Sequence, residues 1–177
     1  QNAEFNKESI ECGGRCGAAN LTHVNLQWAD LTGAYLGEVD LTDARLYLAD
    51  LTGVYLRQAN LTDANLNDAN LTGVNFLLAE LTGTSFYQAD LTNADLTMAD
   101  LTGANLRGAN LTNADLTMAD LIDATLDSAD LTNADLVGAD LTNADLEHAD
   151  LTNANFQGAT VTNANFYSTT WSNTIWI

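Results

Sequence analysis

A five-residue repeat runs without an insertion from residue 19 to the end of the chain, and it restricts the fold more than any other feature. Every fifth position from Leu21 to Trp176 holds 25 Leu, 4 Phe, 2 Trp and one Val, and the position two residues earlier is Ala in 25 of 32 cases. A period of five fits neither an α-helix, which turns every 3.6 residues, nor a strand, which alternates every two. A backbone that keeps these apolar side chains on one side must therefore change direction within every repeat.

Each repeat divides into a short extended triplet and a corner. Residues two apart share one face of a strand, so each Ala–x–Leu triplet points two apolar side chains inward and one side chain outward. The other two residues turn the corner. The second corner residue is Gly, Asn or Asp at 15 of 16 sites in one set of repeats and at only 4 of 15 in the alternate set. Gly and Asn tolerate the positive φ of a type II turn, so we expect type II corners to alternate with a second kind.

The alternation also predicts the size of a coil. It requires an even number of repeats, and two repeats would make a coil too flat to hold both apolar layers, so we expect four repeats, or 20 residues. Side chains of one kind recur at this spacing, as in Tyr47, Tyr87 and Tyr167, and in Leu78, Met98 and Met118. Residues 19–170 then form about eight coils, each adding about 4.8 Å. Central residues such as Leu101 should be buried throughout.

The pattern A(D/N)Lxx, present here as ADLTN, ANLTD, ADLTM and ANLRG, resembles the pentapeptide-repeat proteins. The resemblance covers about nine tenths of the chain, and the unbroken array looks most like the cyanobacterial members. It implies an all-β fold, a right-handed quadrilateral parallel β-helix of about eight coils of 20 residues. It implies little about function, because most members have none assigned. Relatives that bind DNA gyrase as DNA mimics often carry projecting loops or a break in the array, and this sequence shows neither.

Residues 1–18 precede the regular array and are expected to form an N-terminal cap that contains Cys12 and Cys16. Cys16 stands on the inward frame, five residues before Leu21, so one interpretation is a buried free thiol. The other, which we favour, is a disulfide between Cys12 and Cys16, which fits the glycines between them and an oxidising compartment. The chain starts at Gln1 instead of Met, as after removal of a signal peptide or a tag. We therefore expect the periplasm or the thylakoid lumen, with the cytoplasm as the alternative.

The C-terminal segment, residues 171–177, is expected to form an apolar cap. It carries Trp171, Ile175, Trp176 and Ile177. Terminal coils of a solenoid expose their stacking faces, so these side chains either cover the last coil or form the seam of an end-to-end homodimer. Both the monomer and the homodimer stay open.

The chain is strongly acidic, with 24 Asp+Glu against 5 Lys+Arg and a net charge of −19. Nucleic-acid binding needs clustered Lys and Arg, and no apolar run is long enough to cross a membrane, so we expect neither partner. At the spacing of 20, the acids align in columns that we take as a candidate interaction surface for a basic protein or for divalent cations: Asp95, Asp115 and Asp135, and Asp100, Asp120 and Asp140. The alternative is a solvated face that keeps the rod soluble. Repulsion within a column should raise the pKa of members such as Asp120.

The sequence predicts no catalytic, cofactor-binding or metal-binding residues. Its carboxylates recur with the repeat and no insertion forms a pocket, and two thiols with distant His23 and His148 do not make a zinc site. We therefore expect a non-enzymatic structural or protein-interaction module, a rigid acidic rod that binds an unknown protein partner. One alternative is a DNA mimic that binds a type II topoisomerase. The other is an ice- or surface-binding protein that uses threonine columns such as Thr92, Thr112 and Thr132.

Overall fold

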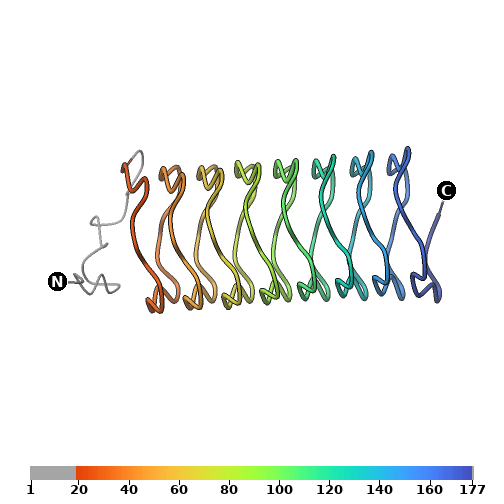
Figure 1. Ribbon diagram of the computed structural model, residues 1–177, viewed down its shortest axis with the longest axis horizontal. Helices are drawn as coiled ribbons and strands as arrows, with labels where there is room; N and C mark the ends of the chain where they lie inside the picture. Colours follow the sequence, from red (N-terminus) through yellow and green to blue (C-terminus); the bar gives the residue numbers. More distant parts are fainter. Residues whose placement is uncertain (1–18, 177) are drawn as a thin grey trace.

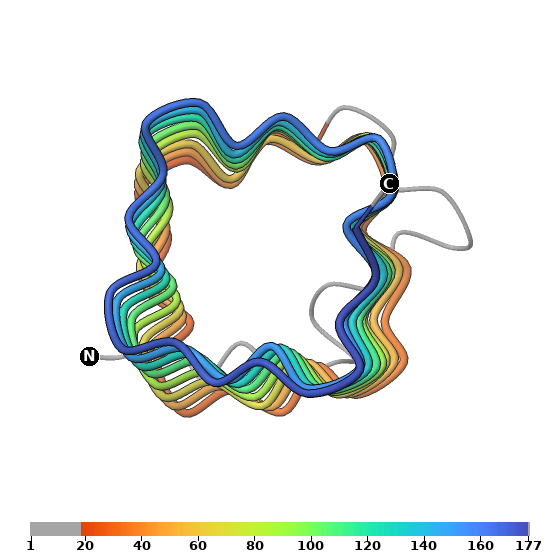
Figure 2. The same cartoon turned by 90° about the vertical axis from the view of Figure 1, so that its right-hand side faces the viewer.

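The chain winds into a rod of stacked coils in the computed structural model, which describes residues 19–176 (Figure 1). Viewed along the rod, the coils have a square outline (Figure 2). Residues 20 apart form parallel bridges, from Asn20 with Asp40 through to Asn155 with Ile175. The bridge is the only regular element among residues 19–176: each repeat contributes one bridge residue, and neither a helix nor a longer strand occurs there. The right-handed quadrilateral parallel β-helix with 20 residues per coil is thus confirmed.

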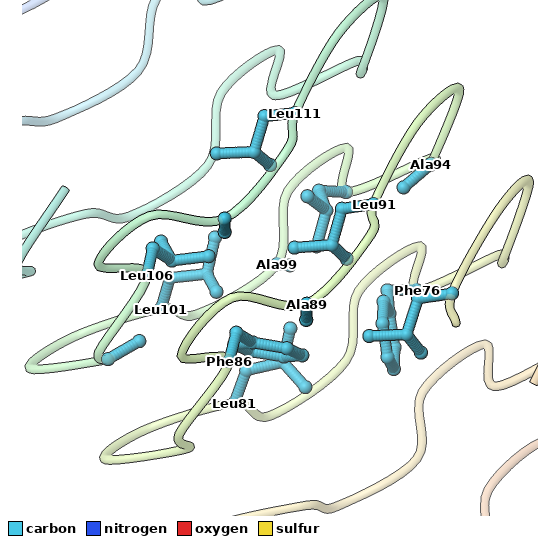
Figure 3. Packing of buried hydrophobic residues seen from close by; sticks show 14 of the residues in the cluster. Phe76, Leu81, Phe86, Ala89, Leu91, Ala94, Ala99, Leu101, Leu106 and Leu111 are labelled. Atoms are coloured by element: carbon cyan, nitrogen blue, oxygen red, sulfur yellow. The ribbon is translucent and has the colours of Figure 1, made fainter. Parts of the chain in front are cut away.

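Both apolar positions of the repeat point into the rod (Figure 3). Central residues from Leu26 to Phe156 are buried, and Leu81, Leu101 and Leu121, which lie one above another, are fully so. The prediction that Leu101 belongs to the core is confirmed. Each fully buried leucine of this kind contributes about 1.5–3 kcal/mol relative to an exposed one. The rod is therefore filled by its own side chains.

A threonine replaces alanine at one fully buried position of the core. The hydroxyl of Thr84 donates a hydrogen bond to the carbonyl oxygen of Leu61 in the preceding coil, at 2.7 Å. Thr174 does the same towards Leu151, also at 2.7 Å. Within residues 19–176, every buried side-chain nitrogen or oxygen has a hydrogen-bond partner.

The backbone pairs in a fixed way within each repeat. The N–H of the first residue, the inward Ala, donates to the carbonyl three residues back and closes the preceding turn. The N–H of the outward residue donates to a carbonyl of the preceding coil. The N–H groups of the central residue and of the second corner residue donate to carbonyls of the following coil. In repeat 99–103 these bonds are Ala99 to Leu96 (3.0 Å), Asp100 to Ala79 (3.0 Å), Leu101 to Asp120 (2.7 Å) and Gly103 to Ile122 (2.8 Å). Four N–H groups of five thus have backbone partners, and prolines would remove such bonds.

All corners share one backbone conformation. The second of the two corner residues has a φ between 54° and 72° in every repeat from His23 to Asn173. Corners of both sets close with the same bond, from Val24 N–H to the Leu21 carbonyl and from Ala29 N–H to the Leu26 carbonyl. The expectation of two alternating corner types is therefore wrong. A four-sided coil must turn by the same amount at each corner, so the alternation in residue type reflects side-chain surroundings and not the backbone.

Some predicted features lie outside the described residues. They are the N-terminal cap with Cys12 and Cys16, and Ile177 at the other end, so the disulfide stays a prediction. The predicted apolar segment continues the ladder, since Ile175 pairs with Asn155. No helix within the described part of the chain is long and apolar enough to cross a membrane.

Candidate interaction surface

The outward residue of most repeats is Asp or Asn, and its side chain completes the backbone pairing. Its Oδ1 accepts a hydrogen bond from the N–H two residues later, as between Asp140 and Thr142 at 2.9 Å or Asn110 and Thr112 at 3.1 Å. This N–H is the fifth of the repeat, the one that the backbone bonds do not use. The Thr142 hydroxyl adds a second bond to the same Oδ1 at 2.6 Å. Asp and Asn both supply Oδ1, which explains why they share the same columns.

The six acids of the candidate surface stand in the two predicted columns. Bridges link Asp95 to Asp115 and Asp115 to Asp135, and likewise Asp100 to Asp120 and Asp120 to Asp140. We call these the Asp95 column and the Asp100 column. All six use Oδ1 to accept the N–H two residues later, and all except Asp115 are half-buried. The surface is therefore an array of carboxylates that the fold itself holds in place.

Hydrogen bonding sets the pKa of Asp100 in the direction opposite to our expectation. Burial raises its pKa, but hydrogen bonds from the Thr102 hydroxyl and N–H and from the Thr82 hydroxyl outweigh burial and hold the pKa below its ordinary value. The pKa of Asp40, in the same column, is also lowered, first by the Thr42 hydroxyl and then by the Thr42 N–H. The predicted rise from stacked charges is thus wrong at Asp100, because hydrogen-bond donors stabilise its charged form.

An exposed apolar column separates the two acidic columns. Leu78, Met98 and Met118 occupy the second corner position between them, with 37%, 47% and 60% of their surfaces exposed. Next to this corner, Tyr35 and Tyr55 stack face to face, with ring centroids 4.7 Å apart and planes within 4°. Both tyrosines are exposed. The spacing of 20 aligns the Leu and Met residues, but neither this spacing nor the residue types predicted that they and the two tyrosines are exposed beside one another.

A ladder of asparagines borders the Asp95 column on its other side. Each Nδ2 donates to the Oδ1 of the asparagine one coil earlier, at 2.9–3.3 Å, through Asn93, Asn113, Asn133, Asn153 and Asn173. A shorter ladder joins Asn163 to Asn143 and Asn143 to Asp123. These bonds fix the corners relative to one another and make the surface more rigid.

The threonine columns have their hydroxyls turned towards their own coils. The Thr92 hydroxyl donates to Asp90 and the Thr112 hydroxyl donates to Asn110, at 2.5 and 2.7 Å. Asn110 in turn donates to the Thr92 oxygen at 2.9 Å. Thr92, Thr112 and Thr132 are all half-buried. This arrangement disfavours a role in binding ice, because these hydroxyls already serve the fold.

A shallow hollow lies on the N-terminal coils and was not foreseen from the sequence. It is lined by His23, Asp43, Arg45 and Asp63, among others, and His23 Nδ1 lies 3.4 Å from Asp43 Oδ2. Its charges are mixed, and it contains no Ser or Cys nucleophile. Among residues 19–176, no three His, Cys, Asp or Glu side chains are placed to hold a metal ion.

Aromatic side chains close part of the C-terminal end. Trp176 stacks on Phe156, with centroids 4.6 Å apart and an angle of 15°, and Trp171 lies 5.1 Å from both Phe166 and Trp176. Both tryptophans remain 41% exposed. They thus pack on the last coils without being covered themselves, and this is compatible with either a lid or a homodimer seam.

The fold and its surface define a class: a β-helical repeat protein with a filled interior and regular outer columns. The family model for pentapeptide repeats matches residues 19–58, 59–97, 89–127, 99–136 and 129–167. The chain belongs to the pentapeptide repeat family, as its sequence pattern predicted.

Solved structures agree with this assignment. HetL, a pentapeptide repeat protein involved in heterocyst differentiation regulation from the cyanobacterium Nostoc sp. PCC 7120, is 32% identical over 89% of both chains, with a TM-score of 0.44. Trypsin-treated QnrB1, a plasmid-mediated fluoroquinolone resistance protein, is 17% identical over 90% of this chain and 87% of its own, with a TM-score of 0.68. At that identity, QnrB1 shows the shared fold alone. The search of curated proteins found no match.

Proposed function

We propose that the protein is a non-enzymatic interaction module, a rigid rod that presents fixed columns of side chains to a protein partner. The observation that carries this proposal is the register of the surface: acidic side chains and exposed apolar side chains repeat in line from one coil to the next. Binding costs less conformational entropy when side chains are already held in place, and the Oδ1 bonds and asparagine ladders hold them.

The shape of the rod supports binding over chemistry. Its interior is filled by leucine, alanine and phenylalanine, whereas enzyme sites are usually concave. We also propose, from the cysteine pair Cys12 and Cys16, that the protein works in the periplasm or the thylakoid lumen. Mass spectrometry of the protein from its natural source, with and without reduction, tests that disulfide.

Site-specific photo-crosslinking in the source organism tests the interaction module. A benzoylphenylalanine at position 118 lies between the acidic columns, and one at position 128 lies on another exposed corner as the control. We expect the position-118 variant to crosslink to one protein in a one-to-one complex, and we expect the control variant not to crosslink to it. A set of products that is the same at both positions, or no product at any surface position, would contradict the proposal.

A DNA mimic that binds a type II topoisomerase is the second candidate. The net charge of −19 and the fold shared with QnrB1 favour it. A supercoiling assay with purified gyrase and increasing amounts of the protein decides between the two. Inhibition that depends on the Asp95 and Asp100 columns would establish the DNA mimic, and unchanged supercoiling would reject it.

A further inference from the structure

Five exposed apolar side chains lie at or beside one corner of the rod, one in each of five successive coils. Two tyrosines occupy the outward position of the column that Asp95 continues, and a leucine and two methionines occupy the second corner position next to it. We call them the apolar edge: Tyr35, Tyr55, Leu78, Met98 and Met118. Together they span four coil spacings, or roughly 19 Å. Scattered exposed apolar residues are ordinary on a protein surface, but a group of them in successive coils is typical of a contact surface.

The fold does not require these residues at the corner. Leu78, Met98 and Met118 have φ values of 60°, 56° and 57°, a region that strains side chains other than Gly and Asn. The same corner holds Gly138 and Gly158 in later coils. Positive φ is common to all corners, so what distinguishes this corner is exposed apolar surface in three successive coils, where the later coils show that Gly suffices.

Charge decides which partner fits the edge. Asp95 stands three residues before Met98 and Asp100 two residues after it, and Asp115 and Asp120 flank Met118 in the same way. One base, Arg57, stands on this corner, two residues after Tyr55, whereas Arg107, in the coil of Met118, lies on a different corner and pairs with Asp127 at 2.8 Å. The carboxylates on both sides of Met98 and Met118 would repel the same part of a second copy or an anionic membrane, whereas they attract a cationic partner.

We infer that the apolar edge is the docking site for a cationic amphipathic α-helix of a partner protein, an assignment that rests on the proposed function and specifies its partner. A helical turn rises 5.4 Å and a coil of the rod about 4.8 Å. Three side chains of the helix, one per turn, therefore stay within about 1.2 Å of the same corner in three successive coils. Long Lys and Arg side chains on both sides of the apolar stripe reach the Asp95 and Asp100 columns. The Met118 side chain lies towards Gly138, with Cγ 3.5 Å from the place of a Cβ there, which extends the apolar surface along the edge.

The two methionines make the test direct, because the chain has only 2 and both lie on the edge. The probe is a peptide of about 18 residues, or five helical turns, with leucines at i, i+3, i+4 and i+7 and lysines elsewhere. A peptide of the same composition with scattered leucines is its control. We expect the amphipathic peptide to shift both ¹³C-methyl signals of the methionines in NMR spectra. Unmoved signals, or equal shifts with the scattered peptide, would overturn the inference.

Paired variants separate apolar contact from general attraction of charge, with affinities measured by fluorescence anisotropy of labelled peptide. Met98→Gln with Met118→Gln should weaken binding by about tenfold or more, or 1.4 kcal/mol. Asp100→Asn with Asp120→Asn keeps Oδ1 and should weaken binding several-fold. The matched pair Asp90→Asn with Asp130→Asn, on another side of the rod, should leave affinity unchanged, and an equal loss there would overturn the inference.

The outcomes also separate this inference from the proposed function. A partner crosslinked only through another side of the rod, with no peptide effect on the methionines, would reject the edge and keep the interaction module. Peptide binding at the edge with no crosslinked partner at any surface position would reject the module as a cellular function.

Discussion

At the residue scale, each outward Asp serves both the fold and the surface. Oδ1 accepts the N–H left over in the repeat, and the negative charge faces outward along a column. Asn performs the first task without the second, as Asn110 does between Asp90 and Asp130. Exchange between Asp and Asn can therefore change the charge pattern of the rod while its backbone stays the same.

Asp140 tests this division of roles. Asp140→Ala removes the acceptor of two bonds from Thr142 and should lower the free energy of unfolding by about 1–2 kcal/mol, whereas Asp140→Asn should change it by under about 0.5 kcal/mol. Urea unfolding measures both values. Equal losses in the two variants would show that the charge, and not Oδ1, matters for stability.

The lowered pKa values of Asp40 and Asp100 predict loss of stability in acid. A carboxyl whose folded-state pKa is below its unfolded value contributes stability above the unfolded pKa of about 3.9 and loses it as pH falls through the folded pKa. We expect the melting temperature to fall as the pH falls below about 4. This reverses the stabilisation by acid that charge repulsion alone would produce. Asp100→Asn should show a smaller fall than the unmodified protein, and an equal or larger fall would contradict this account.

At the scale of the repeat, the corner is the unit that all coils share. In every corner the second residue has a positive φ, whatever its side chain, and four such equal turns close one coil. Gly and Asn reach this conformation at low cost, while Leu48, Gln58 and Met118 reach it under strain. The corners thus carry varied surface side chains on one backbone.

Valine at either kind of corner should destabilise the rod. Met118 and Asn143 have φ values of 57° and 60°, and a β-branched residue resists this region, so each change should cost about 1–2 kcal/mol. Asn143→Val should cost more, because it also breaks bonds to Asp123 and Asn163. Met118→Asn, the control, should be neutral or stabilising. Thermal unfolding compares the three, and a Met118→Val variant as stable as the parent would show that strain is not the cause.

At the scale of the whole molecule, the rod is a one-dimensional stack in which each coil is supported by its two neighbours. Interior central residues such as Leu101 are fully buried, whereas Leu21 and Val161 near the ends are only half-buried. The same substitution should therefore cost most in the middle of the stack.

Leu101 provides the corresponding test. Leu101→Asp places an uncompensated charge in the core and should cost at least several kcal/mol, whereas Leu101→Met keeps the volume and should cost under about 1.5 kcal/mol. Circular dichroism during heating follows both variants. Unfolding of Leu101→Asp at the parent's temperature would contradict the decisive role of the stacked core.

The C-terminal end predicts association of two rods. No charged side chain follows Asp150, and Trp171 and Trp176 lie partly exposed on either side of the last bridge residue, Ile175, so two such ends can meet through apolar contact. We expect a reversible homodimer in sedimentation experiments and a monomer after Trp176→Glu. A parent that stays monomeric at every concentration would show that these tryptophans form a lid.

The sequence by itself determined the coil length, the inward and outward positions, and the columns. An array without insertions has one register, so pairing residues 20 apart at one point aligns every other column, including that of Asp100, Asp120 and Asp140. It also predicted the burial of Leu101, because residues two apart in an extended triplet share a face.

Only the tertiary structure decided the corner backbone, the role of the acids, and which aligned residues are exposed. Residue types at the corners of Met118 and Asn143 differ while their φ values agree, because closing the coil sets the turn and the side chain adapts to it. The pKa of Asp100 depends on hydrogen-bond donors from Thr102 and from Thr82, one coil away. The exposure of the apolar edge depends on the packing of the corner between the Asp95 column and the Asp100 column. These properties arise from contacts between coils, and a linear repeat does not specify the balance among such contacts.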